Sequence, residues 1–302
     1  MGYFDFIPSV AYPNDEGGRT IVKDILVRGK IIDALREAAS AALEYTVEDE
    51  EKPETLAYRI YGRADYHWLI LLFNEIHDPF FSWPMSINEM EKHMEASYSG
   101  KALFIDPVGL WDYDKELPLD RRVPHFARGD LIQQKDTSGS VVATAEVVSW
   151  DPNLYKVVVD SVSGSFRLVG EAARHTSVIS DRTALTRDIT TVNSTGKTIT
   201  VPLVRITDDN RYALQRFENS SQEEISPWFR AKGNPTPIIE KYALGRSEVF
   251  PMGNNEVGED LGNATIVTNI ENEERINESK RRIKVMRPEY IDLVLRDFRS
   301  LF

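Results

Sequence analysis

The chain has 302 residues, of which 41% are hydrophobic, and it contains no cysteine. The lack of cysteine excludes disulfide bonds, thiolate metal sites and cysteine nucleophiles, and it fits assembly in a reducing cytoplasm. A formal net charge of −12 disfavours general nucleic-acid binding, since affinity for phosphate backbones comes from Lys and Arg. No apolar run approaches the roughly 20 residues that cross a bilayer. We therefore expect binding to neither nucleic acid nor membrane.

The N-terminal residues 1–28 are predicted to form an arm. Prolines and polar residues separate its aromatic side chains, in a spacing that is neither helical nor strictly alternating. Large exposed apolar patches are rare on monomers, so the arm is expected to dock, either on its own domain or on a neighbouring subunit. Its aromatic residues are Tyr3, Phe4, Phe6 and Tyr12.

The next elements are predicted as a helix, a strand and two short helices. Residues 29–43 carry an apolar stripe at helical spacing, and residues 43–47 alternate as a strand does. The first short helix begins at Pro53, whose missing N–H would be unpaired there in any case. It ends at Gly62, which adopts the left-handed conformation at little cost.

The second short helix and the loop after it are rich in aromatic residues. The helix begins near Asp65 and buries a stripe that includes Trp68. Prolines at 79 and 84 prevent the helix from continuing, so a rigid loop over residues 78–84 is expected, carrying Phe80, Phe81 and Trp83. Residues 87–98 are a further helix candidate.

From residue 101 onward the chain becomes rich in Val, Thr, Ser and Gly. Short strands separated by turn signals over residues 101–212 indicate an antiparallel barrel or sandwich. Within it, residues 198–206 are expected to be an edge strand, because Pro202 cannot donate to a central ladder. Prolines and glycines over residues 213–276 predict an irregular, extended segment. The aromatic residues within it favour an ordered segment that wraps along the protein over a flexible linker.

The C-terminal residues predict a strand followed by a helix. Residues 282–285 alternate as a strand does. Pro288 then begins a helix whose apolar face includes Ile291, Leu295 and Phe298.

These residues resemble two known families. The strand at 43–47, the acidic loop after it and the segment Pro53–Leu56 are similar to the LysM module. A fuller pattern resembles the baseplate wedge subunits of contractile-tailed bacteriophages, the gene product fifty-three family of T-even phages. That pattern consists of Tyr61-Gly62, Trp68, Leu71-Leu72, Asn74, Asp78-Pro79-Phe80 and Trp83, supported by Tyr3–Pro8 before Val22–Arg28 and by Asn277-Glu278 before Arg282–Met286. The resemblance covers about residues 1–100 and 277–302.

The resemblance implies an α+β fold in which the strand at 282–286 pairs with the strand at 43–47. This pairing would complete a LysM-like βααβ module and make the β-rich region an insertion within it. The expected divisions are an N-terminal arm and helix (1–42), the LysM-like module (43–100, completed by strand 282–286), the β-rich insertion (101–212), the irregular extended segment (213–276) and a C-terminal strand and helix (277–302).

The resemblance also implies a function and partners. It indicates a structural wedge protein, assembled in the host cytoplasm and present in the virion tail, which joins neighbouring wedges into a hexameric baseplate ring around the hub. The implied partners are other wedge subunits, a sheath-initiator-like subunit and central hub proteins, with multiple copies of the chain in each six-fold baseplate. The candidate interface residues are Tyr3, Phe4, Phe6, Trp68, Phe80, Phe81, Trp83, Ile291, Leu295 and Phe298.

Catalytic signals are weak, so we expect no enzyme, cofactor or metal site. The five histidines do not form the HExxH metal-binding spacing, and the sequence has neither a nucleophile elbow nor a Walker phosphate loop. The acidic run at 48–51 fits acid/base work in a glycosidase, but a solvated acidic loop before a helix explains it more simply. Two alternatives to the wedge function stay open: a LysM-type binder of peptidoglycan or another glycan, and a cell-wall hydrolase of the tail.

Overall fold

The computed structural model describes residues 5–13, 18–24, 41–105, 126–136, 139–168, 185–192, 198–230, 234, 236–244, 249–253 and 261–301. The chain divides into two compact units, which we call unit 1 (Met1–Lys92 with Glu274–Phe302) and unit 2 (His93–Glu273). Helices and strands both contribute, as the α+β prediction requires. Within the described ranges, no helix has the length and apolarity of a membrane span.

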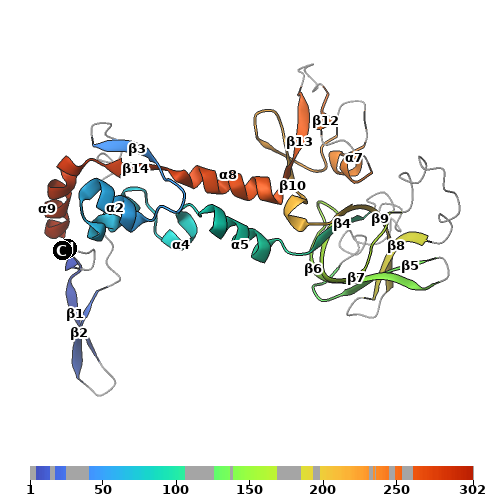
Figure 1. Ribbon diagram of the computed structural model, residues 1–302, viewed down its shortest axis with the longest axis horizontal. Helices are drawn as coiled ribbons and strands as arrows, with labels where there is room; N and C mark the ends of the chain where they lie inside the picture. Colours follow the sequence, from blue (N-terminus) through green and yellow to red (C-terminus); the bar gives the residue numbers. More distant parts are fainter. Residues whose placement is uncertain are drawn as a thin grey trace. The chain divides into compact units, whose positions relative to one another are not determined.

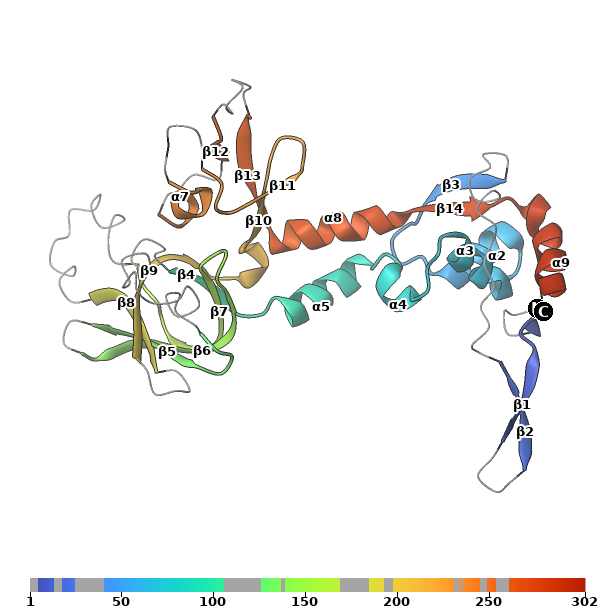
Figure 2. The ribbon, with the colours of Figure 1, turned by 180° about the vertical axis from the view of Figure 1, so that it is seen from behind.

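Unit 1 combines short helices with two pairs of strands (Figures 1 and 2). The strands are β1 (Ser9–Pro13), β2 (Arg19–Lys23), β3 (Ala42–Thr46) and β14 (Arg282–Met286). The helices are α2 (Pro53–Tyr61), η2 (Ala64–Tyr66), α3 (His67–Phe73), α4 (Pro79–Ser82), α5 (Ile87–Ser97), α8 (Asn269–Arg281), η6 (Pro288–Tyr290) and α9 (Ile291–Leu301). The boundaries between the units fall within α5 and α8.

The N-terminal arm contains a β-hairpin that its irregular aromatic spacing did not predict. Strands β1 and β2 pair antiparallel, with Ser9 opposite Lys23 and Pro13 opposite Arg19. Cross-strand pairing therefore defines this part of the arm, even though every residue of both strands is exposed. The helix predicted over residues 29–43 lies mostly outside the described residues. Its C-terminal end is wrong, because Ala42 and Leu43 belong to β3.

Strands β3 and β14 pair antiparallel, which confirms the expected pairing between the two ends of the chain. Thr46 lies opposite Arg282, and Leu43 lies opposite Val285. Between these strands in sequence, α2 begins with Pro53 and ends at Gly62, whose φ of 70° is the left-handed conformation expected there. The strand and helix boundaries of this part follow from local sequence signals.

Two asparagine side chains pair with main-chain groups far away in sequence. Asn74 donates through Nδ2 to the carbonyl of Lys284 at 2.7 Å and accepts from the amide of Lys284 at 2.8 Å. Asn277 pairs in the same way with Met85, at 2.9 Å and 2.7 Å. Each side-chain amide donates one hydrogen bond to a single residue's main chain and accepts one from it, as a residue of a neighbouring β-strand does.

Replacing Asn74 with Ala is expected to weaken the attachment of β14. The variant loses two hydrogen bonds to Lys284, at about 1 kcal/mol each, so the protection of the β14 amides against hydrogen exchange should fall about tenfold or more. Mass spectrometry of exchanging peptides measures this. The control variant Asn88→Ala removes an exposed side chain with one long contact to Glu50 and should change little. Unchanged protection of β14 in Asn74→Ala would contradict this account.

The β-rich region of unit 2 is a closed antiparallel barrel rather than a sandwich. Its strands follow the order β4-β7-β6-β5-β8-β9, and β9 returns to pair with β4. Valine and alanine side chains of β6 and β7 fill its interior, together with Leu103 and Ile132. The barrel strands are β4 (Lys101–Ile105), β5 (Leu131–Asp136), β6 (Val141–Asp151), β7 (Lys156–Gly164), β8 (Leu185–Val192) and β9 (Thr198–Thr207).

The prediction that residues 198–206 form an edge strand is wrong, because β9 has neighbours on both sides. It pairs with β8 from Thr198 to Pro202 and with β4 from Leu203 onward. Pro202 is therefore the position at which one pairing ends and the next begins. A residue without an N–H is accommodated there.

The segment 213–276, predicted to be irregular, instead forms a small sheet with helices. The sheet is antiparallel in the order β11-β10-β13-β12. It shares one hydrophobic core with the barrel, where Tyr242 contacts Phe104 at 5.3 Å and Phe217 at 6.0 Å between ring centroids. The elements of this segment are β10 (Leu214–Glu218), β11 (Glu224–Ile225), α7 (Ile238–Leu244), β12 (Val249–Pro251) and β13 (Asn263–Thr268), and the short helix η5 (Asn210–Tyr212) precedes them.

Two glycines, Gly139 and Gly164, differ in how closely another part of the backbone approaches them. A Cβ on Gly164 would lie 2.1 Å from the carbonyl oxygen of Val142, whereas one on Gly139 would meet nothing within 4 Å. Both glycines have positive φ, which costs an alanine about 1–2 kcal/mol. Gly139→Ala should therefore lower the free energy of unfolding by about that amount, and Gly164→Ala by about 3 kcal/mol or more. Denaturant titration of both variants measures the difference, and equal losses would contradict the close approach.

Candidate protein interface

Three of the predicted interface residues form an aromatic cluster inside unit 1. The ring of Trp68 lies 5.6 Å from that of Phe6 and 5.3 Å from that of Phe298, and Phe6 lies 6.0 Å from Phe298. All three side chains are buried. They join the N-terminal arm, α3 and α9 into one core. The arm therefore docks through Phe6 on its own domain, which is one of the two possibilities that the sequence left open.

Three further candidates are also buried in unit 1. Ile291 and Leu295 belong to the same cluster as Trp68. Trp83 belongs to a second cluster, with Leu56 and Ile283, and its Nε1 donates to the main-chain oxygen of Glu51 at 2.8 Å. Buried side chains offer no area to a partner, so these residues stabilise the unit itself. The candidates Tyr3 and Phe4 lie outside the described residues.

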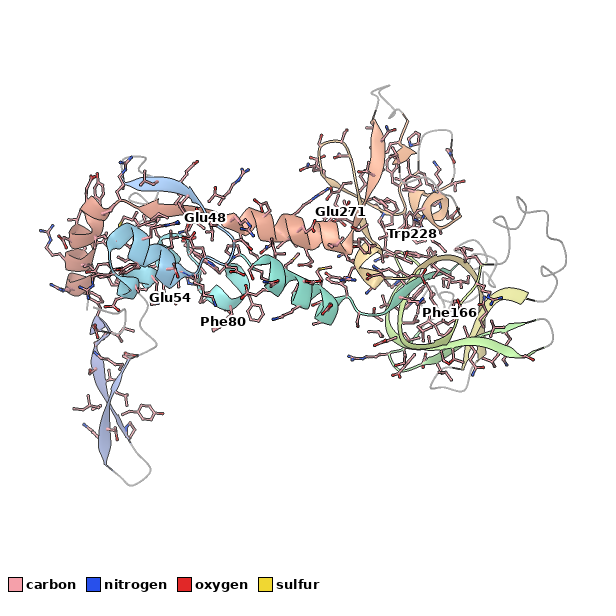
Figure 3. All side chains as sticks on the ribbon, in the orientation of Figure 1. Glu48, Glu54, Phe80, Phe166, Trp228 and Glu271 are labelled. Carbon is pink, nitrogen blue, oxygen red and sulfur yellow. The ribbon has the colours of Figure 1, made fainter. Side chains whose placement is uncertain are left out.

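Phe80 and Phe81 are the candidates that the structure exposes. Phe80 is 90% exposed and Phe81 is 79% exposed, and both belong to the one-turn helix α4. Figure 3 labels Phe80 on this helix. The backbone beneath them is fixed: the Asp78 carboxylate accepts from the amide of Phe80 at 3.1 Å, and the Lys280 ammonium donates to the carbonyl of Phe81 at 2.9 Å. Two large apolar rings are thus presented to solvent on an ordered turn.

A groove of about 850 Å³ lies beside α4. Its apolar lining includes Leu71, Trp83 and Phe80, and its acidic lining includes Glu50 and Glu54. Glu54 and Phe80 are labelled in Figure 3. The groove therefore combines apolar surface with negative charge, and it is formed by the loop before α2 together with the segment around α4.

The acidic loop at 48–51 is only partly solvated, in contrast to the sequence-based interpretation. The Glu51 side chain is 6% exposed and accepts hydrogen bonds from the Tyr45 hydroxyl at 2.8 Å and from the Arg59 guanidinium. Burial raises the pKa of Glu51, while the hydrogen bond from the amide of Glu48 opposes that rise. Glu51 thus fixes the loop from inside, and its neighbour Glu50 stays exposed.

Two features of the surface were not predicted from the sequence. The first is the hairpin, where Tyr12 is 65% exposed and Ile21 is 77% exposed. The second is the acidic side of the groove, to which Glu54 contributes from outside the acidic run at 48–51. A possible signal was the concentration of acidic residues beside Pro53. In the described part of the chain, no cluster of three or more His, Asp or Glu side chains could hold a metal ion.

Comparison with known proteins finds one family model that matches the N-terminal part of the chain. Residues 22–102 match the model of a protein family described as base plate wedge protein 53. The match supports a baseplate wedge subunit. The family resemblance is therefore confirmed over a segment that contains β3, the helices α2 to α5 and the Phe80-Phe81 turn. No curated protein matches the chain.

The match supports a structural role in a phage baseplate, and the matched family implies a component of the phage tail. It implies assembly with other baseplate subunits. The family is structural and is not a known enzyme family. The match does not test the LysM-like module, which stays a prediction.

Truncating buried and exposed aromatic residues of unit 1 should change the free energy of unfolding by different amounts. Trp68→Ala removes a buried ring from the core and should lower the free energy of unfolding by about 3–5 kcal/mol. Phe80→Ala removes a ring already in solvent and should change it by no more than about 0.5 kcal/mol. Thermal or denaturant unfolding measures both. A large loss in Phe80→Ala would show that this ring is a core residue and not an interface residue.

Proposed function

We propose that this chain joins neighbouring wedges of a phage tail baseplate into a hexameric ring around the central hub. The observation that carries the proposal is the pair of exposed rings, Phe80 and Phe81, within the segment that matches the wedge family. Large aromatic side chains at the centre of an interface commonly contribute about 2 kcal/mol or more each. An ordered turn that exposes two of them is well suited to protein binding.

The proposed partners are other wedge subunits, a sheath-initiator-like subunit and hub proteins. The proposed binding surfaces are the α4 turn and the hairpin of β1 and β2, whose exposed apolar residues a monomer leaves uncovered. Several modest contacts suffice in a ring. Once the first contacts form, later ones become effectively intramolecular and gain from a high effective concentration. Assembly in the host cytoplasm is part of the proposal and agrees with a chain that lacks cysteine.

The arrangement around β3 and β14 supports the proposed LysM-like module. Two strands from opposite ends of the chain pair, and α2 and α3 follow the first of them. In the proposed domain division, unit 2 is then an insertion in this module. The glycan-binding alternative has no comparable support, since the matched segment belongs to the model of a baseplate wedge family.

The double variant Phe80→Ala/Phe81→Ala should fold normally but fail to build baseplates. Its folding should be unaffected because both rings are exposed, while the loss of two interface anchors should reduce incorporation at least tenfold. Electron microscopy and quantitative mass spectrometry of particles from a complementation assay measure incorporation.

The matched control for that experiment is Tyr58→Ala, which removes a 66% exposed ring from α2 outside the groove. It should assemble normally. Baseplates of normal number and shape from the double variant would contradict the proposed interface. Retention of the purified chain on peptidoglycan, lost in the double variant, would favour glycan binding instead.

A further inference from the structure

We propose that the groove beside α4 receives a positively charged segment of another baseplate subunit, with Lys or Arg side chains at Glu50 and Glu54 and an apolar side chain against Phe80. This inference rests on the proposed function, since it names the chemistry of one partner. It extends that function because it assigns a binding groove and a charge to the interface, where the exposed rings alone specify neither.

The charge of the groove is negative, and only part of it is satisfied within the chain. Four glutamates line the groove, against one lysine, Lys52. Glu51 is held by Arg59 and Tyr45. Glu89 forms a capping box with Ser86, which donates to it from both its amide and its hydroxyl at 3.0 Å. These hydrogen bonds lower the pKa of Glu89 and keep its charge.

The remaining two glutamates face solvent. Glu50 is exposed and accepts a long hydrogen bond from the Nδ2 of Asn88 at 3.4 Å. Glu54 is exposed in the first turn of α2. The backbone that carries both residues is anchored, because Glu51 and Pro53 between them are held by hydrogen bonds and by burial. The two negative charges therefore lie on one fixed stretch of backbone, which a cation of a partner can recognise.

The groove is apolar as well as acidic, and this combination restricts the occupant. Leu71, Pro79, Phe80 and Trp83 contribute apolar lining, and Phe81 extends the exposed apolar surface of α4. Arg and Lys suit such a surface because their methylene stems pack on apolar groups while their charged ends reach carboxylates. An arginine can also stack on the exposed ring of Phe80.

A second copy of this chain is a poor occupant. The chain carries a net charge of −12, so a second copy approaching an acidic groove meets repulsion. Two cations of the basic run at 280–282 already have partners within unit 1: Lys280 donates to the carbonyl of Phe81, and Arg281 contacts Val47 and Asp49. Charge complementarity thus favours a different subunit with a basic surface segment.

Site-specific photo-crosslinking in assembled baseplates tests the inference. Phe80 is replaced by p-benzoylphenylalanine in the full chain, particles are irradiated, and the crosslinked peptide is sequenced by mass spectrometry. The expected peptide comes from a different baseplate subunit and carries at least two Lys or Arg residues. The charge reversal Glu50→Lys/Glu54→Lys should reduce the crosslink about tenfold, because two attractive pairs become repulsive.

The control reversal is Glu91→Lys/Glu289→Lys, which changes the net charge equally at two exposed glutamates of unit 1 that do not line the groove. It should leave the crosslink within about twofold of the parent, and melting temperatures check that all variants fold. A crosslink to an acidic or uncharged segment, to another copy of this chain, or to nothing would overturn the inference. So would a crosslink that the groove reversal leaves unchanged.

The experiment also separates this inference from the proposed function. If the Phe80→Ala/Phe81→Ala variant fails to assemble but the groove reversal assembles and crosslinks normally, the interface stands and the basic occupant is wrong. If the alanine variant assembles normally, the proposed interface itself fails.

Discussion

The pairing of β3 with β14 is the constraint on which the rest of unit 1 depends. These strands lie near opposite ends of the chain, and neither has another strand neighbour among the described residues. An isolated pair of strands is at best marginally stable in water. The pair persists because Ile283 and Val285 enter the core formed by Leu56 and Ile70. The sheet therefore needs the helices, and the helices need the sheet to cover their apolar faces.

Asn74 completes this arrangement at the outer edge of β14. A two-stranded sheet leaves each strand with one unpaired edge, which is a site for unwanted association. Asn74 pairs with both main-chain groups of Lys284 and, through the same Nδ2, contacts the carbonyl of Ile70 at 2.8 Å. One side chain thus covers part of an edge and ties it to the end of α3. This explains in physical terms why an asparagine occupies a position of the family-like pattern.

The elements predicted well are those whose signals are local. Pro53 and Gly62 fix the ends of α2 through backbone geometry alone, and the apolar stripe of α9 needs only helical periodicity. The pairing of β3 with β14 is not local, and it was predicted from family resemblance. Without that resemblance, alternating residues at 43–47 and 282–285 give no information about which strand is the partner.

The elements predicted badly are those where the same residues suit two structures. Pro251 suggested an irregular segment, but it ends β12, an edge strand where a missing N–H is tolerated. Gly253 and Gly262 lie just beyond these strands, where the amides of Leu261 and Met252 donate to their carbonyls and continue the main-chain hydrogen bonding past β12 and β13. In a sheet with strands this short, turn residues are so frequent that the sequence resembles an extended loop.

Burial was the hardest property to predict for the candidate interface. Trp68, Trp83 and Phe80 are all aromatic residues of one family-like pattern, yet the first two are buried and the third is exposed. The difference arises from α4. The Asp78-Pro79 pair begins a new helical turn, with Asp78 as its N-cap, and this turn directs Phe80 away from the core that Trp83 enters. Composition shows how many rings a segment has, whereas the turn decides which of them face solvent.

This division of aromatic residues suits a protein that must fold before it assembles. A subunit whose anchoring rings were also its core rings would lose its fold whenever it lacked a partner. Here the core is complete without Phe80 and Phe81, since the clusters around Trp68 and Leu56 do not include them. The exposed rings can therefore change with the partner while the buried ones cannot. An interface placed on α4 leaves β3, β14 and their helices as a scaffold that binding does not have to reorganise, and a scaffold ordered in advance loses less entropy on binding.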